Sequence, residues 1–341
     1  MKKLISLLAS FVLVLAGCGS SSDDNTLVIS TWDFNVDLME ETWIQPFEEE
    51  TGIDVVLDTG STGERYSKVE SNPNHGVDIM FTSQYYESKG QEAGLWADFD
   101  SSKLENYDKL YTNAQAPNGE AGGPAYTYNR LAIVYNADSV DGELSSWADI
   151  VNNDSIEKIT IPNITDTHGP SLLYAIADTL GVDLFTPEGE DAVFAELEDL
   201  KSIVTKPYTS STDVINMMQS GEAQVALVPE YYFDSIKEVV PGATWVDPTE
   251  GAVLNFNTID ITAASEKQDM AYQFIDYMLS TEVQANVAAA HLDPPVNSEV
   301  QLDTYIDGIP FESVDSFDSI DYTQVIEHMD DWQVRYNEIY A

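Results

Sequence analysis

The sequence predicts an α/β protein that is large enough to form two lobes. Short apolar segments of strand length alternate with amphipathic helical patterns along the chain, which is typical of α/β folds with largely parallel sheets. The chain has 341 residues, of which 43% are hydrophobic and 11% aromatic. A chain of this length and composition can bury more than one core of ordinary domain size.

The first hundred residues follow this alternation. Residues 38–52 have the apolar spacing of an amphipathic helix that stops at Gly52, and "STGERYSKVES" (61–71) opens with Ser61 and Glu64 at the spacing of a capping box. We interpret this spacing as a helix cap rather than as an anion site. The predicted strands are "TLVIST" (26–31), "IDVVLDT" (53–59) and "VDIMFTS" (77–83).

The rest of the chain has the same two kinds of segment in a different rhythm. The predicted strands are "LAIVYNADSV" (131–140), "KITIPN" (158–163), "AQVALVP" (223–229) and the long "GAVLNFNTIDIT" (251–262), which we expect to return to the first lobe. One helix is predicted to start within 145–150. Further helices are predicted over 170–181, 192–204, 212–222, 267–290 and 322–341.

The N-terminus has the pattern of an export signal. Lys2 and Lys3 precede an apolar run over 4–16, which is too short to span a membrane. The run ends in "LAGC", which resembles the bacterial lipobox, and this resemblance implies cleavage before Cys18 and lipid attachment to it. We therefore expect a signal peptide over 1–17 and a flexible tether over 18–25. The alternative is an ordinary secreted protein with an unrelated cysteine.

Composition excludes several classes of function. Cys18 is the only cysteine, so the chain has no disulfide and no cysteine-based zinc site. Cleavage would remove Lys2 and Lys3, so the formal net charge would fall from −46 to −48. We do not expect nucleic acid as a partner, because phosphate binding needs clustered Lys and Arg. The acidity itself indicates solubility or a salty habitat rather than a site.

Several segments together resemble the extracellular solute-binding proteins of ABC importers, and the spermidine/putrescine-binding subfamily in particular. They are "FEEETGIDVVLDT", "VDIMFTSQYYESKGQEAGLWADFDSSKLENYDKL", "LAIVYNADSV", "SSWADI", "SGEAQVALV" and "AYQFIDYMLSTEVQANVA". The resemblance implies a two-lobed periplasmic-binding-protein-like fold in which two hinge-crossing strands join the lobes. It implies a first lobe over 26–130 plus 258–297 and a second over 131–257 plus 298–341.

Open parallel α/β sheets bind ligands beyond the carboxyl ends of their strands. That rule selects "TWDFN" (31–35), "TSQYY" (82–86), "TDTHGPS" (165–171), "PEYY" (229–232) and "NFN" (255–257), all rich in aromatic and polar groups. To these we add the acid of "HLDPPVN". The candidate ligand-binding residues are Trp32, Asp33, Ser83, Tyr85, His168, Ser171, Glu230, Tyr231, Asn255, Asn257 and Asp293.

These residues depart from the polyamine pattern that the resemblance implies. The resemblance implies ligand-binding acids in the loop matching "TDTHGPS" and in the return strand. At the matching positions this chain has His168 and Ser171 in the loop and Asn255 and Asn257 in the strand. Glu230 and Asp293 can restore the carboxylates that a buried ammonium needs. Trp32, Tyr85 and Tyr231 offer aromatic faces to a cation. We therefore expect a polyamine or another organic amine as the ligand.

Ferric ion is the alternative ligand. "ALVPEYYF" resembles an element of ferric-ion-binding proteins in a related family, which carry adjacent tyrosines after a comparable strand. That resemblance implies iron on the phenolates of Tyr231 and Tyr232, with a carboxylate or a histidine from the other lobe as a further ligand, His75 being one candidate. Adjacent residues of an extended segment point to opposite sides, so both phenolates reach one metal only if the chain bends at Pro229.

The sequence contains no GxSxG, HExxH, Walker-type or dinucleotide motif, and we expect neither an enzyme nor a cofactor. A lipoprotein adhesin or sensor is the other alternative to transport. The expected partners are a small-molecule ligand, the permease of an ABC importer and the membrane through the lipid on Cys18. We expect a monomer on the extracytoplasmic side of the cell membrane.

Overall fold

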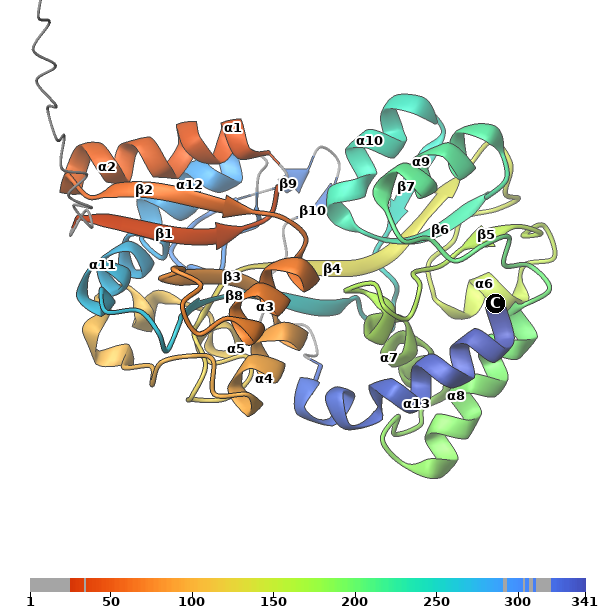
Figure 1. Ribbon diagram of the computed structural model, residues 1–341. Coiled ribbons are helices and arrows are strands. Elements are labelled where there is room, and N and C mark those ends of the chain that lie inside the picture. Colours follow the sequence, from red (N-terminus) through yellow and green to blue (C-terminus); the bar gives the residue numbers. More distant parts are fainter. Residues whose placement is uncertain (1–24, 34, 291–292, 303, 307–308, 311–319) are drawn as a thin grey trace, which may run out of the picture.

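The computed structural model describes residues 25–33, 35–290, 293–302, 304–306, 309–310 and 320–341. It forms two lobes joined by two long strands, β4 (Ala125–Asn136) and β8 (Val253–Ile261), as Figure 1 shows. Cys18 and the rest of the predicted signal peptide and tether through residue 24 lie outside the described residues. The predicted α/β fold class with two strands crossing between the lobes is confirmed.

The strands form one curled sheet in the order β2-β1-β3-β8-β4-β6-β5, with β7 paired to β4. The pairs β1–β2, β1–β3 and β5–β6 are parallel, whereas every pair that includes β4 or β8 is antiparallel. The prediction of largely parallel sheets was therefore wrong. Because β4 and β8 run in opposite directions between the lobes, they pair antiparallel with each other, and β3, β6 and β7 also run antiparallel to the one that each pairs with.

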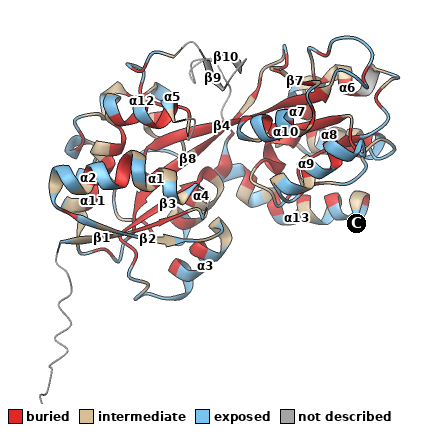
Figure 2. Ribbon diagram, turned by 90° about the horizontal axis from the view of Figure 1, so that it is seen from above, coloured by how far each residue is buried: buried red, intermediate tan, exposed pale blue. Residues whose placement is uncertain are grey.

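The first lobe contains β1, β2, β3 and the adjoining parts of β4 and β8, and its helices cover both faces of this part of the sheet (Figures 1 and 2). Its strands are β1 (Thr26–Thr31), β2 (Asp54–Thr59) and β3 (Ile79–Ser83). Its helices are α1 (Val36–Met39), α2 (Gln45–Thr51), α3 (Thr62–Ser71), α4 (Gln84–Glu92), α5 (Thr112–Gln115), α11 (Gln268–Met278) and α12 (Thr281–Ala289). Short 3₁₀ turns cover Ser101–Lys103 and Tyr107–Lys109.

The second lobe contains β5 (Ile159–Thr160), β6 (Val225–Pro229) and β7 (Ala243–Val246). Its helices are α6 (Ala148–Asn152), α7 (Gly169–Leu180), α8 (Pro187–Leu200), α9 (Ser211–Ser220), α10 (Phe233–Val239) and α13 (Tyr322–Tyr340), with a 3₁₀ turn over Glu230–Tyr232. Separately, β9 (Thr304–Ile306) pairs antiparallel with β10 (Ile309–Pro310).

Each lobe has its own apolar core. Residues between Leu27 and Tyr128, together with Leu254 to Val296, supply the largest core of the first lobe. Residues between Leu131 and Val246, together with Ile320 to Ile339, supply the largest core of the second. The division of the chain at 130/131, 257/258 and 297/298 stays a prediction.

Some predicted elements differ from the observed ones for local reasons. The single helix predicted over 267–290 is two helices, because the Ser280 hydroxyl accepts a hydrogen bond from Val283 N–H and caps a new one, α12. The helix predicted over 38–52 begins at Val36, passes through a π-helical turn at Glu40–Ile44 and ends at Gly52, as predicted, in the left-handed conformation. Ser61 and Glu64 form the predicted capping box.

Candidate functional site

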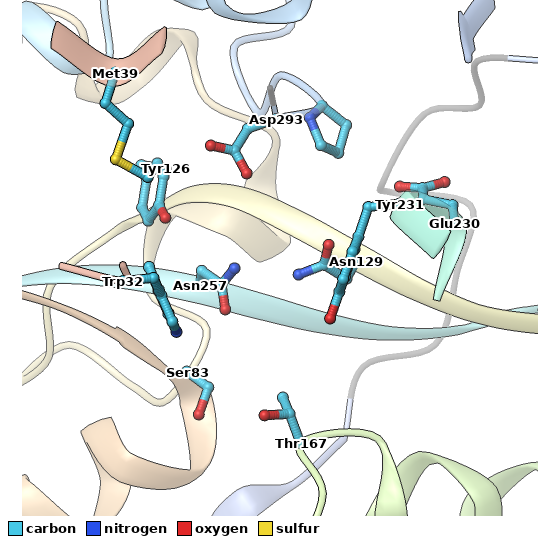
Figure 3. Close-up of a pocket in the computed structure, with 11 residues that line it drawn as sticks. Trp32, Met39, Ser83, Tyr126, Asn129, Thr167, Glu230, Tyr231, Asn257 and Asp293 are labelled. Atoms are coloured by element: carbon cyan, nitrogen blue, oxygen red, sulfur yellow. The ribbon is translucent and has the colours of Figure 1, made fainter. Parts of the chain in front are cut away.

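A cavity of about 190 Å³ lies between the two lobes, where β4 and β8 cross. This volume lies below the roughly 300–1,000 Å³ of common ligand pockets, so the cavity has room only for a small molecule. Figure 3 shows the side chains converging on it from both lobes. The lining residues are Trp32, Met39, Ser83, Tyr126, Asn129, Thr167, Glu230, Tyr231, Asn257, Asp293 and Pro294.

Six of the candidate residues line this cavity, namely Trp32, Ser83, Glu230, Tyr231, Asn257 and Asp293. They come from ends of β1, β3 and β6, from β8, and from the segment after α12. The carboxyl-end rule explains the first three positions, because the parallel strands β1 and β3 and the strand β6 all end at the cleft. The other five candidates lie elsewhere.

Trp32 forms one wall of the cavity and is held by two side chains of α3. Its indole Nε1–H donates a 2.8 Å hydrogen bond to the Thr62 hydroxyl, and the Arg65 guanidinium carbon lies 5.0 Å from the ring centroid. Asp33, the next residue, is exposed and does not line the cavity. The structure therefore places only the aromatic member of this pair at the site.

Asp293 supplies a carboxylate to the upper side of the cavity in Figure 3. Burial raises its pKa to about 7, while a hydrogen bond with the Thr127 hydroxyl acts in the opposite direction. No basic side chain forms an ion pair with Asp293 among the residues that the structure describes. A cation placed beside this carboxylate would restore its ionised form.

Glu230 also lines the cavity, but its charge is already balanced. The Arg130 Nε–H donates a 2.6 Å hydrogen bond to Glu230 Oε2, and both side chains are 2% exposed. Arg130 also pairs with Asp247 at 3.2 Å. Burial raises the pKa of Glu230, and Arg130 opposes that rise. Glu230 Oε1 is buried without a hydrogen-bond partner in the described structure, so it remains an acceptor at the cavity wall.

The adjacent tyrosines lie in the 3₁₀ turn that follows β6, so the chain does bend there. Tyr231 faces the cavity and is 39% exposed. Tyr232 packs against the second-lobe cluster around Val228 and Tyr208. The two rings are perpendicular with centroids 4.9 Å apart, and their phenol groups are close enough for a hydrogen bond.

His168, Ser171 and Asn255 are buried behind the cavity and do not line it. They belong to the packing of the loop over 163–171. The Asn255 side-chain amide donates to the Thr167 carbonyl at 3.0 Å, and His168 N–H donates to Asp166 Oδ1 at 2.9 Å. Their contacts fix the position of Thr167, which does line the cavity.

A second crevice of about 160 Å³ continues from the cavity and shares Ser83 and Thr167 with it. Tyr85 lies in this crevice and packs edge-on toward Tyr322 of the second lobe, with ring centroids 6.5 Å apart. Asp166 faces the same crevice. The sequence interpretation selected the loop that holds Asp166 but favoured His168 and Ser171 within it.

The other lining residues that sequence reasoning missed have weak signals. Tyr126 and Asn129 lie on β4 upstream of the strand predicted at 131–140, so they were not expected at a strand end. Tyr126 stacks on Phe81 with ring centroids 4.6 Å apart. Nothing in the sequence around Met39 or Pro294 distinguishes them from ordinary helix and loop residues. Only the fact that β4 crosses the cleft, rather than ending there, would have identified Tyr126 and Asn129.

His75 lies before the start of β3, at the opposite end of that strand from Ser83. Its Nδ1 accepts a hydrogen bond from Val77 N–H at 2.9 Å. The structure therefore does not bring His75 to the tyrosine pair. Among the described residues, no three or more His, Cys, Asp or Glu side chains gather as metal ligands, and no helix has the length and apolarity of a membrane span.

Comparison with known proteins gives concordant results. Residues 75–319 match the family described as "Bacterial extracellular solute-binding protein". The chain is 26% identical to the putrescine-binding periplasmic protein PotF of Escherichia coli over 310 residues, covering 84% of this chain and 82% of that protein.

Solved structures agree with the fold. The crystal structure of an ABC transporter from Clostridium perfringens is 38% identical, with a TM-score of 0.85, and covers 92% of this chain and 100% of that one. The spermidine/putrescine substrate-binding protein PotD of Streptococcus pneumoniae is 22% identical, with a TM-score of 0.72, over 92% of this chain and 97% of that one.

Proposed function

Because this chain belongs to the family of bacterial extracellular solute-binding proteins, and is thus a solute-binding protein of an ABC importer, we propose that its ligand is a polyamine or another small organic amine. The relationship to putrescine-binding and spermidine/putrescine-binding proteins supports this proposal at low identity. Cys18 would anchor the chain to the cell membrane through lipid, with the permease as its partner.

The observation that carries the amine proposal is Asp293. It is a carboxylate without an ion-pair partner, within the described structure, in a cavity that also presents Trp32, Tyr126 and Tyr231. Burial of an ammonium is unfavourable unless a carboxylate or several acceptors meet it. Asp293 provides the charge, and the side-chain oxygens of Asn257 and Ser83 are available as neutral acceptors.

Asp166 is suited to a second ammonium. It lies in the crevice that continues from the cavity through Ser83 and Thr167, so a linear molecule can extend from Asp293 toward it. The methylene chain between two such ammonium groups would then lie between Trp32 of the first lobe and Tyr231 of the second. Glu230, which Arg130 neutralises, would accept a hydrogen bond there rather than balance a charge.

Ferric ion is a second candidate, favoured by the contact between the phenol groups of Tyr231 and Tyr232. Burial raises the pKa of Tyr232 most, and the negative charge of Asp166 raises it further. Phenolate and carboxylate oxygens are suitable ligands for a hard cation. The packing of Tyr232 against the second-lobe core makes this arrangement less accessible than the cavity beside Asp293.

The test is calorimetric titration of the lipid-free chain from Ser20 onward with putrescine, spermidine, butylamine and ferric citrate. We expect putrescine or spermidine to bind with the highest affinity, because two carboxylates are available to two ammonium groups. Binding of ferric ion alone, with a coloured complex, would replace the amine proposal by the ferric one. Binding of none of these would reject both.

A further inference from the structure

Arg65 lies against the indole of Trp32 but outside the cavity. Its side chain is 3% exposed, its guanidinium carbon is 5.0 Å from the indole centroid, and it does not belong to the lining residues. The guanidinium therefore covers one face of the indole without itself lining the cavity. A planar guanidinium stacks well on an aromatic face, so this contact favours one orientation of the ring.

Backbone carbonyls fix the guanidinium itself. Arg65 Nε donates to the Gly60 carbonyl at 3.0 Å, and Nη1 donates to the Phe81 carbonyl at 2.8 Å. These acceptors belong to the loop after β2 and to β3, which both lead to the cleft. The rigid fork of donors on arginine can reach both at once, whereas the single ammonium of lysine cannot.

Thr62 completes the arrangement. Its hydroxyl accepts the 2.8 Å hydrogen bond from Trp32 Nε1–H and also lies 3.5 Å from Arg65 Nη2. The plane of the indole is thus defined by a stacking contact on one face and by a hydrogen bond at its edge. Both come from α3, whose first turn carries the capping box.

The burial of Arg65 has a cost that these contacts only partly offset. Burial lowers its pKa to about 10, and the nearby Tyr126, Asp58 and Asp33 act in the opposite direction. No carboxylate forms an ion pair with Arg65 in the part of the chain that the structure describes. A leucine or methionine would fill the same space without a buried charge, so packing alone does not account for an arginine here.

We propose that Arg65 is a positioning residue for ligand binding, which together with Thr62 fixes the indole plane of Trp32 against the cavity. The proposal rests on the proposed function to the extent that Trp32 is taken to contact the ligand. Arg65 itself does not touch the ligand. Its effect on affinity should therefore pass entirely through Trp32.

The first test needs no ligand. The chain has six tryptophans, so ¹⁵N-labelled protein should show six indole N–H resonances, and Trp32→Phe identifies the one that belongs to Trp32. We expect Arg65→Lys and Thr62→Val to shift this resonance and to leave the other five in place. Lys68→Gln is the matched control, because Lys68 lies on the same helix with a side chain that is 42% exposed and pairs with Asp58. It should shift none of the six.

The second test is a double-mutant cycle with putrescine as the probe. Arg65→Lys should weaken putrescine binding about tenfold in the otherwise native chain and by less than about twofold in a Trp32→Leu background. Equal weakening in both backgrounds, or an unmoved Trp32 resonance in folded Arg65→Lys, would overturn the proposal. If Arg65→Lys does not fold, Thr62→Val carries the same two comparisons. If the native chain does not bind putrescine, the proposed function fails, and the resonance test still decides whether Arg65 orients Trp32.

Discussion

Asp293 and Glu230 show why two carboxylates in one cavity have different roles. Glu230 is buried against Arg130, so its charge is already balanced inside the protein. Asp293 has a hydroxyl partner, and burial raises its pKa to about 7. A cationic ligand gains more from the carboxylate that lacks a cation, because pairing there removes an existing desolvation penalty.

Asp293→Asn should weaken putrescine binding strongly. Loss of one partner of a buried charge pair costs about 2–5 kcal/mol, which corresponds to a Kd roughly 30-fold higher or more. Glu230→Gln should change the Kd less, and it should mainly lower stability because it removes the negative charge that Arg130 meets at 2.6 Å. Calorimetric titration and thermal melting of both variants provide the comparison. A larger affinity loss in Glu230→Gln than in Asp293→Asn would reverse the assignment.

The affinity for putrescine should depend on pH through Asp293. An ammonium pairs with the ionised carboxylate, and a pKa of about 7 leaves Asp293 largely protonated at pH 5.5 in the empty cavity. Affinity should therefore rise from pH 5.5 to about 8 and then level off, until the amine itself begins to lose its proton. The Asp293→Asn variant should show a flatter profile over the same range. An equally steep profile in that variant would assign the titration to another group.

The tyrosine pair distinguishes the two candidate ligands. Tyr231→Phe keeps the aromatic face toward the cavity, so putrescine binding should change by less than about threefold. Iron reverses this expectation, since removal of the phenol deletes a metal-ligating oxygen and the visible phenolate-to-iron absorption band. Absorption spectra of the native chain with ferric citrate, beside Tyr231→Phe and Tyr232→Phe, are the measurement. A coloured native complex that either variant bleaches would support the ferric candidate.

For single residues, the sequence predicted which side chains lie at the cavity better than it predicted what each side chain does there. The carboxyl ends of strands correctly selected Trp32, Ser83 and Tyr231 as cavity residues. The same rule placed Glu230 at the cavity, but it did not predict the ion pair of Glu230 with Arg130. Arg130 is 100 residues away in sequence, and no local pattern around either residue indicates that they pair. His168 was chosen over Asp166 because the alignment compared positions, whereas the direction of each side chain depends on how the loop packs against Asn255.

Two buried carboxyl groups join elements of the first lobe. Glu87 lies on α4 and Asp260 on β8, and both are almost fully buried. Asn118 donates to Glu87 at 2.5 Å, and Gly123 N–H donates to Asp260 at 2.9 Å. Burial raises the pKa of both groups, to about 7 for Asp260 and well above its usual range for Glu87, whose pKa the Asp260 charge raises further.

This pair should make the first lobe less stable in alkaline solution. Because both pKa values are raised by folding, the folded state binds more protons than the unfolded chain above about pH 4. The free energy of unfolding should therefore decrease as the pH rises toward and through 7, by an amount on the order of a few kcal/mol. Melting temperatures at pH 5.5, 7 and 8.5 test this. Asp260→Asn should flatten the dependence, and an unchanged slope in that variant would contradict the assignment.

The elements themselves were largely predictable, and their pairing was not. Periodicity identified β1, β6, β8, α7 and α13, because each buries one consistent face or run. The break between α11 and α12 was missed because the apolar residues keep their helical spacing across Ser280. The side chain of Ser280 nevertheless caps a new helix there. Strand direction was missed because antiparallel pairing at β4 and β8 follows from two passages between lobes, which no local pattern encodes.

The predicted anchor concerns the molecule as a whole. Cys18 is the only cysteine, so lipid attachment through the lipobox depends on this one residue. Cys18→Ala should release soluble protein or leave the precursor uncleaved, and membrane fractionation with N-terminal sequencing separates these results. If the variant is processed and still partitions with lipid, the proposed lipoprotein anchor is wrong. The ligand proposal would be unaffected, because it rests on the residues that line the cavity and not on Cys18.

The cavity takes residues from both lobes, so ligand binding should favour the arrangement in which the lobes are closest. A ligand shifts such an equilibrium only through its higher affinity for one arrangement, and a molecule that touches Asp293 and Trp32 on one side and Tyr231 on the other has that preference. In the described sheet, the strands β4 and β8 pass from one large core to the other, and they are the hinge about which we expect the lobes to rotate.

Small-angle X-ray scattering of the lipid-free chain from Ser20 onward, with and without saturating putrescine, tests this account most directly. We expect a smaller radius of gyration in the bound protein, and no such decrease in Asp293→Asn at the same putrescine concentration. Calorimetry on the same samples establishes saturation. An unchanged scattering profile at proven saturation, or no binding of putrescine by the native chain, would contradict the claim that the two lobes close on an amine.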